Sequence, residues 1–164
     1  MTELFFVLTM CAAFCTALLG GTFFAFSVFF MRALGGLSAE RGIVAMQATV
    51  LAIKKPVFLV LFFGTALLCV FLGAIAAFTW RQTPAHYVFV GAALFLVGGF
   101  GVTMLRRVPL NNTLLAWSPD DTDALEQWRG HRLTWVRWNH VRAITTLLAC
   151  AAFMLALAGV GLPV

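Results

Sequence analysis

The side chains best suited to chemistry in this chain lie close together, at Asn139, His140 and Arg142. A partly buried histidine beside a cation favours its neutral form, which a general base requires, so His140 is a candidate base. Arg142 begins an apolar segment and could stabilise an enolate or a carboxylate in a dry site. Plainer interpretations stay open, because an interfacial histidine is often a hydrogen-bonded structural group and an arginine there an anchor. These three residues form the candidate catalytic set.

Other polar side chains fall within or beside apolar sequence, and most are expected at the arginine-rich end of the molecule. Polar groups buried without partners are costly, so this clustering indicates either pairing at helix ends or a wet cavity. The tryptophans could stack on a flat ligand or form an interfacial belt. The candidate substrate-binding residues are Ser27, Gln47, Thr103, Asn111, Asn112, Trp135 and Trp138.

The spacing of the potential metal ligands does not favour a metal centre. His131 and His140 are too far out of helical register for one helix to direct both at the same ion. No carboxylate lies within an apolar segment to build a di-iron Glu-x-x-His set. We therefore expect no metal and no cofactor, although a haem with one axial ligand from His86 or His140 stays open.

Composition defines the surroundings in which these residues must act. The 164-residue chain is 62% hydrophobic and only 10% charged, whereas water-soluble domains carry about 25% charged residues. It cannot cover a small body with polar surface, which excludes an ordinary soluble enzyme, a disordered tail and a disulfide-stapled secreted module. The net charge of +5 is explained by insertion into a membrane with anionic lipids, so no nucleic-acid partner is expected.

Four segments without Asp, Glu, Lys or Arg are long enough to cross a bilayer as helices, which takes about 20 residues. They are residues 4–31, 57–80, 87–105 and 143–162. This predicts an all-α fold, an integral membrane four-helix bundle with one membrane domain over residues 1–164. All Lys and Arg residues except Arg81 lie in or beside the first and third connections, so the positive-inside rule places both termini outside the cytoplasm.

The connections also carry helical patterns. Residues 39–53 place Ile43, Met46, Val50 and Ile53 on one face behind Ser38 as an N-cap, which predicts an amphipathic helix along the membrane surface. From about residue 122 we expect a cytoplasmic helix that continues into the fourth span. Small residues at helical spacing, such as Ala17, Gly21 and Ala25, favour close helix packing, either within the chain or in a homo-oligomer or with a partner subunit.

Five strings carry a family resemblance. They are Gly21-Thr-Phe-Phe-Ala-Phe-Ser27 with Met31, Arg41-Gly-Ile with Ala45-Met-Gln47, Lys55-Pro56-x-Phe58, Gly101-Val-Thr103 with Val108-Pro-Leu-Asn111-Asn112, and Trp135-Val-Arg-Trp138-Asn139-His140-Val-Arg142. In this order, over nearly the whole chain, they resemble the anthrone oxygenase-like family of small membrane proteins. Many bacterial members have no assigned function, and the resemblance makes a bacterial inner membrane the expected location.

The resemblance implies oxidation of a flat, lipophilic anthrone or phenolic substrate at the inner membrane interface, without a dedicated metal or flavin. An anthrone C–H flanked by two aryl rings is acidic enough for a positioned base to form an enolate, and the enolate can reduce O₂ directly. From residue type alone we assign His140 as the base, and Asn111, Asn139 and Arg142 as the groups that hold the oxyanion.

A non-enzymatic role is the alternative, as a lipid- or quinone-binding protein or a scaffold subunit of a larger complex. The shape of the interior distinguishes the two. A pocket lined by His140, Asn139, Asn111 and Gln47 and open to the bilayer would favour the oxygenase. A helix-end network with every polar group paired and no void would favour the scaffold.

Overall fold

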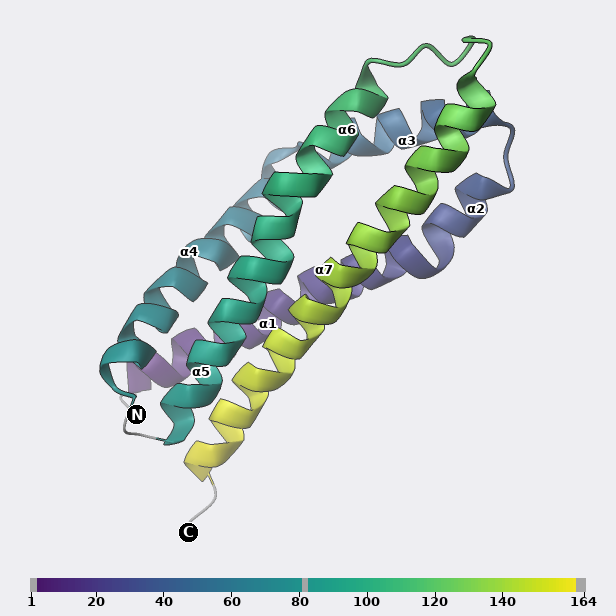
Figure 1. Ribbon diagram of the computed structural model, residues 1–164. Helices are drawn as coiled ribbons and strands as arrows, with labels where there is room; N and C mark the ends of the chain where they lie inside the picture. The colour runs from purple at the N-terminus through teal and green to yellow at the C-terminus, as the bar shows by residue number, and fades with distance from the viewer. Residues whose placement is uncertain (1–2, 81–82, 162–164) are drawn as a thin grey trace.

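Within residues 3–80 and 83–161, which are those that the computed structural model describes, the regular structure is helical throughout and includes four long rods (Figure 1). The rods are Glu3–Gly35, α4 (Pro56–Phe78), Pro84–Leu115 and α7 (Ala124–Gly161). Each is long and apolar enough to cross a membrane. The predicted all-α membrane bundle of four helices is thereby confirmed.

Two of the rods change helix type along their length. The first consists of α1 (Glu3–Ala25), the π-helical η1 (Phe26–Phe30) and α2 (Met31–Gly35). The third consists of α5 (Thr83–Leu94), the π-helical η2 (Phe95–Gly101) and η3 (Thr103–Arg107), and α6 (Val108–Leu115). The i→i+5 turns of a π-helix are rare and frequent at functional sites, because they rotate the side chains that follow. The shorter α3 (Ala39–Ile53) connects the first two rods.

The third rod is longer than the sequence pattern indicated. We expected this span to end at residue 105 and to give way to a connection, but the helix continues to Leu115. Pro109 lies in the first turn of α6, directly after the π-helical η3, so its ring and its missing N–H fall where the rod changes from π-helix to α-helix. Arg107 and Asn111 therefore lie on a helix and not on a loop.

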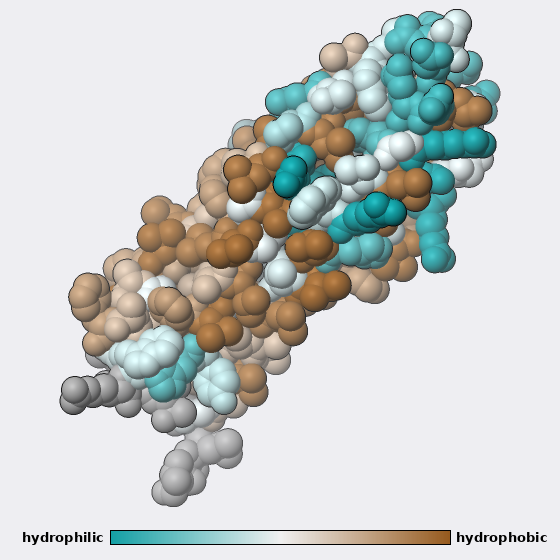
Figure 2. All heavy atoms as spheres, viewed as in Figure 1, coloured by the Kyte–Doolittle hydropathy of each residue, from teal (hydrophilic) through white to brown (hydrophobic). Residues whose placement is uncertain are grey.

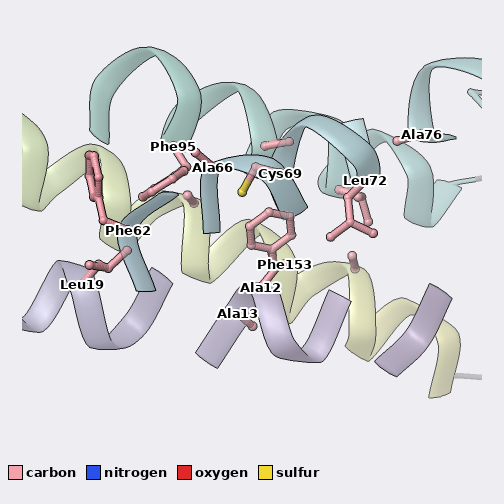
Figure 3. Close-up of a cluster of buried hydrophobic side chains, with 14 of the residues drawn as sticks. Ala12, Ala13, Leu19, Phe62, Ala66, Cys69, Leu72, Ala76, Phe95 and Phe153 are labelled. Carbon is pink, nitrogen blue, oxygen red and sulfur yellow. The ribbon is translucent and has the colours of Figure 1, made fainter. Parts of the chain in front are cut away.

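The last rod, α7, is the centre of the bundle and packs most extensively on α1 and α5. At Gly20 of α1 the absence of a side chain permits close approach, because a Cβ there would lie 3.3 Å from the backbone nitrogen of Leu147. Phe62 of α4, Phe95 of η2 and Phe153 of α7 fill the main apolar core between the rods, together with small residues of α1 (Figure 3).

A second apolar core lies at the arginine-rich end, where α3 packs against α6 and α7. The predicted apolar face of α3 is confirmed, since Ile43, Met46 and Val50 are buried there. This face forms one cluster with Leu114 of α6 and with Trp128 and Trp135 of α7. Ser38 holds the N-cap position, but its side chain makes no capping hydrogen bond.

Two of the three residues of the small-residue motif on the first rod, Ala17 and Gly21, do not pack against another described helix. Ala17 and Gly21 are exposed, and nothing lies within 4 Å of a Cβ added at Gly21. The neighbouring face of α1 faces α7 instead, with Thr16 and Gly20 buried. On α7 the expected small residues, Ala152 and Ala156, are buried in the bundle.

The outer surface is divided between an apolar part and a polar end. Only 33% to 39% of the most apolar stretch of each span is buried inside the molecule, so the remainder needs lipid as its solvent. In Figure 2 hydrophilic residues gather at the end that contains α2, α3 and the start of α7. The other part of the visible face is mainly apolar. The protein is therefore an integral membrane protein with one strongly polar end.

Candidate functional site

A cavity of about 290 Å³ lies between the rods near the polar end, where α1, η1, α3, α4, η3, α6 and α7 meet. Its walls are mainly aromatic, formed by Phe23, Phe26, Phe58, Phe62, Phe63 and Trp135. Its polar lining consists chiefly of Thr103, Arg107, Asn111, Asn112, Asn139 and Arg142. Six of the ten candidate residues from the sequence therefore line one cavity, namely Thr103, Asn111, Asn112, Trp135, Asn139 and Arg142.

Helical register on α7 brings three of these side chains to the cavity. Trp135, Asn139 and Arg142 are four and three residues apart, which places them on one face of an α-helix. All three are buried, with exposed fractions of 1%, 1% and 6%. The same face continues along the helix into the apolar core, where Thr146 and Phe153 are buried. The position of the site along α7 is thus fixed by the packing of the whole helix.

The opposite polar wall comes from the third rod. Thr103 and Arg107 belong to the π-helical η3, and Asn111 follows on α6, each four residues after the last. The hydroxyl of Thr103 donates to the carbonyl oxygen of Gly99 at 2.6 Å, so it is satisfied within its own helix. The Oδ1 atom of Asn111 is buried without a hydrogen-bond partner among the described residues.

Two buried arginines dominate the electrostatics of the cavity. Arg107 and Arg142 are 4% and 6% exposed, and no carboxylate is among the described residues that line the cavity. The Cζ atom of Arg107 lies 3.6 Å from the centre of the Trp135 ring, and that of Arg142 lies 3.8 Å from the centre of the Phe23 ring. These cation–π contacts offset only part of the cost of burying a guanidinium.

Several N–H groups of these guanidiniums have no acceptor. In the described part of the chain, Nε and Nη1 of Arg107 and Nε of Arg142 are buried without a hydrogen-bond partner. Among the described residues, the polar contact that these guanidiniums make is a long hydrogen bond of 3.4 Å from Nη1 of Arg142 to Oδ1 of Asn139. Buried charges are normally paired, so the cavity presents positive charge and free donors to whatever occupies it.

Asn139 is held in place by the first rod. Its Nδ2 atom donates to the carbonyl oxygen of Phe23 at 2.6 Å and to Oγ of Ser27 at 2.7 Å. Ser27 is buried on η1, but it does not line the cavity. The predicted substrate-binding residue Ser27 therefore orients Asn139, and Asn139 in turn contacts Arg142.

His140 is not where the proposed chemistry would need it. It is exposed and lines a separate groove together with Ser27 and Arg137, whereas Asn111 lines the cavity. The expectation that His140 and Asn111 share one chamber is therefore not met. The physical reason is helical geometry, since one residue along an α-helix turns the side chain by about 100°. With Asn139 and Arg142 facing inward, His140 has to face away.

Two other candidates lie outside the cavity. Nε2 of Gln47 donates to the carbonyl oxygens of Leu114 and Trp117, at 2.9 Å and 3.0 Å, and so ties α3 to the end of α6. Trp138 is half-buried and lies under the guanidinium of Arg106, with Cζ 4.9 Å from the ring centre. Neither side chain lines the cavity, so both serve the arrangement of helices around it.

Sequence reasoning missed Arg107 as a site residue, because it assigned the basic residues other than Arg142 to membrane orientation alone. The signal was present, since Arg107 lies midway between Thr103 and Asn111 at four-residue spacing. Sequence reasoning also considered His131 only as a metal ligand. His131 is 5% exposed and lies between Trp117 and Trp128, with ring centres 5.2 Å and 6.3 Å away.

The cavity lining supplies guanidinium, amide, hydroxyl and indole groups. Within the described residues, no three side chains of His, Cys, Asp or Glu lie close enough together to hold a metal ion. The arrangement is suited to binding a flat aromatic molecule and to stabilising negative charge on it.

A comparison with known families gives one match. A family model described as anthrone oxygenase matches residues 58–152, which is more than half of the chain. The matched region contains nearly all of α4, the whole third rod and most of α7, and hence Arg107, Arg142, Asn111 and Asn139. Neither a curated protein nor a solved structure matches the chain. The chain belongs to the anthrone oxygenase family.

Proposed function

We propose that the protein is a cofactor-independent oxygenase, which oxidises a flat, lipophilic anthrone or phenolic substrate bound in the cavity. The observation that carries the proposal is the pair of buried guanidiniums, Arg107 and Arg142, in a largely aromatic cavity whose described lining holds no carboxylate. A buried cation without a partner destabilises a fold. The presence of two such cations, Arg107 and Arg142, is explained if the ligand supplies the negative charge.

The shape of the cavity supports a planar ligand. Its volume of about 290 Å³ is at the lower limit of ordinary ligand pockets, which hold about 300 to 1,000 Å³. Among its aromatic lining residues, Phe26 and Trp135 have ring centres 6.2 Å apart, and Phe58 and Phe62 are stacked with ring centres 6.0 Å apart. Leu59, Phe63 and Val108 are exposed at its rim. A lipophilic substrate dissolved in the bilayer could enter between these side chains.

The guanidiniums would act on the enolate form of the substrate. Loss of the proton from the anthrone methylene carbon places negative charge on the carbonyl oxygen. Arg107 and Arg142 stabilise that charge, and Asn111 can donate an amide N–H to the same oxygen. Hydrogen-bond donors that are fixed in a dry site stabilise the developing negative charge far more than water does, because they need no reorganisation.

The proposed reaction then needs only O₂ as the oxidant. One C–H bond breaks, and the enolate transfers an electron to O₂. Recombination forms a C–O bond, and uptake of a proton gives a hydroperoxide. Loss of water then breaks the O–O bond and the second C–H bond and leaves a carbonyl group. One anthrone and one O₂ give one anthraquinone and one water.

The departing proton would go to water at the rim of the cavity. The described lining contains no imidazole and no carboxylate, and Asn112 and Lys54 are its exposed polar residues. Stabilisation of the enolate by two cations makes the C–H bond acidic enough for a weak acceptor. In this proposal water accepts the proton that residue type alone had assigned to His140, and the arginines stabilise the enolate that remains.

A non-enzymatic protein that binds a quinone is the second candidate. The lack of a proton acceptor in the described lining favours it, since unpaired guanidiniums can also donate to a quinone carbonyl. A pure scaffold has less support, because the interior contains an open cavity and buried donors without partners. Turnover distinguishes binding from catalysis.

The test is O₂ consumption by the purified protein with 1,8-dihydroxyanthrone, above the spontaneous rate. We expect Arg142→Gln to lower kcat about 100-fold or more, as for loss of one oxyanion donor. Arg129→Gln is the matched control, because Arg129 is an exposed arginine of the same helix away from the cavity. No acceleration by the wild type, or equal rates for Arg142→Gln and Arg129→Gln, would reject the oxygenase.

A further inference from the structure

A second hollow, of about 520 Å³, lies where η1 and α2 face α7, and it shares no lining residue with the cavity. Three arginines line it, Arg32 from α2 and Arg132 and Arg137 from α7. His140 also lines it, and no carboxylate is among its described lining residues. We call this hollow the arginine groove. Two elements far apart in the sequence thus direct cationic side chains into one space.

The close approach of α2 and α7 in the groove depends on a glycine. A Cβ added at Gly35 would collide with Nη1 of Arg132, so this guanidinium occupies the space that a side chain at position 35 would take. Arg132 is therefore half-buried against α2, whereas Arg32 and Arg137 are exposed. A guanidinium presents several N–H donors in a rigid fork that matches phosphate and carboxylate oxygens.

The position of the groove along α7 indicates the level in the bilayer at which the groove lies. After Arg142, the helix is free of charged residues as far as Gly159. The segment from His140 to Gly159 rises about 30 Å at 1.5 Å per residue, which is the thickness of the hydrocarbon core. His140 and Arg137 are then at the boundary between hydrocarbon and headgroups. Phosphate groups of phospholipids lie at this level.

The flanks of the groove are apolar. Val28 and Leu133 belong to its lining, and Leu133 is 59% exposed beside it. Phe29, which directly follows Val28 on η1, is 60% exposed. An acyl chain could lie along these side chains while the headgroup meets the arginines. A free inorganic anion would gain nothing from the apolar flanks.

We propose that the arginine groove binds the headgroup phosphate of an anionic phospholipid. This site is distinct from the cavity of the proposed reaction. It differs from diffuse attraction of a basic protein to a membrane, because Arg32, Arg132 and Arg137 converge on one ligand, whereas other basic residues lie elsewhere. A bound lipid at this position would fill the space between α2 and α7.

Native mass spectrometry of the full chain in non-ionic detergent can test this site, with phosphatidylglycerol as the probe. The double variant Arg32→Gln/Arg137→Gln changes two exposed side chains of the groove. Its matched control, Arg41→Gln/Arg129→Gln, removes the same charge from two exposed residues outside the groove. We expect one retained lipid on the wild type and the control, and binding weakened about five-fold per arginine in the groove variant.

Three outcomes would overturn the assignment to an anionic lipid. Equal loss in both double variants would mean attraction by net charge alone. Equally tight binding of phosphatidylcholine would remove the requirement for an anionic headgroup. Displacement of phosphatidylglycerol by millimolar inorganic phosphate would mean a soluble ligand. Circular dichroism and elution volume establish that each variant is folded, and Gly35→Leu, which fills the groove but keeps every charge, should also lose the lipid.

Discussion

At the scale of single residues, the main feature is a pair of uncompensated charges. Arg107 and Arg142 are buried beside aromatic rings and have N–H groups without acceptors in the part of the chain that the structure describes. An interior optimised for stability would hold apolar side chains at these positions, because they carry no desolvation cost. The two arginines therefore lower the stability of the empty protein, and we infer that they are present because they bind the ligand.

Replacement of Arg107 by methionine is expected to stabilise the empty protein. The change removes a buried charge and loses a cation–π contact with Trp135, with a net gain of about 1 to 2 kcal/mol. Thermal unfolding in detergent, followed by circular dichroism, measures it. A lower unfolding temperature for Arg107→Met would mean that the charge is already compensated in the empty protein.

The pH dependence of turnover tests the role of His140. If the proton equilibrates rapidly with solvent water, the enolate fraction rises with pH, so the rate of 1,8-dihydroxyanthrone oxidation should rise steadily with pH. The variant His140→Ala should keep the same profile, because His140 lines the arginine groove. An inflection in the wild type that is lost in His140→Ala would assign the base to His140 after all.

At the scale of helices, the sequence was sufficient to predict the four membrane spans. It was not sufficient to predict which side of each helix faces the interior. Apolar length alone predicts the four rods, and periodicity predicts the buried face of α3. The site depends on which way each side chain points, which the π-helical turns alter on two rods. On α7, a regular α-helix, the neighbours Asn139 and His140 point to two different sides, because each residue turns the side chain by about 100°. Only the packing of α7 as a whole fixes which residue faces inward.

Two neighbouring glycines on α1 test how that packing is fixed. A side chain at Gly20 would meet Leu147 of α7, whereas nothing lies within 4 Å of a Cβ at Gly21. We expect Gly20→Leu to cost about 1 to 3 kcal/mol by overpacking, and Gly21→Leu to change stability by about 0.5 kcal/mol or less. Chemical denaturation in mixed micelles compares them. Equal losses would show that the face with Ala17 and Gly21 is also packed, for example in a homo-oligomer.

At the scale of the whole molecule, the polar end and the apolar spans define its relation to the membrane. The start of α1 and the end of α7 lie at one end of the bundle, opposite the end with α2 and α3 (Figure 1). The cavity and the arginine groove are both near the polar end. A substrate from the bilayer and a lipid headgroup would thus meet the protein at one level.

The orientation of the molecule follows from the positions of its cations and remains to be measured. The basic residues concentrate at the polar end, so we expect that end in the cytoplasm and both termini outside. Reporter fusions at each terminus, one active only in the cytoplasm and one only outside, decide the matter. A cytoplasmic signal from both termini would reverse the orientation.

The most direct test of the arginine-lined cavity is the ionisation state of a bound aromatic ligand. The product analogue 1,8-dihydroxyanthraquinone changes its visible absorption when a phenol group ionises. Bound to the wild type, it should ionise at least about one pH unit lower than when free, because two buried cations favour the anion. The folded double variant Arg107→Gln/Arg142→Gln should lose this shift. A bound ligand that ionises at the same pH as free dye, or an unchanged shift in the double variant, would contradict the central role of the two arginines.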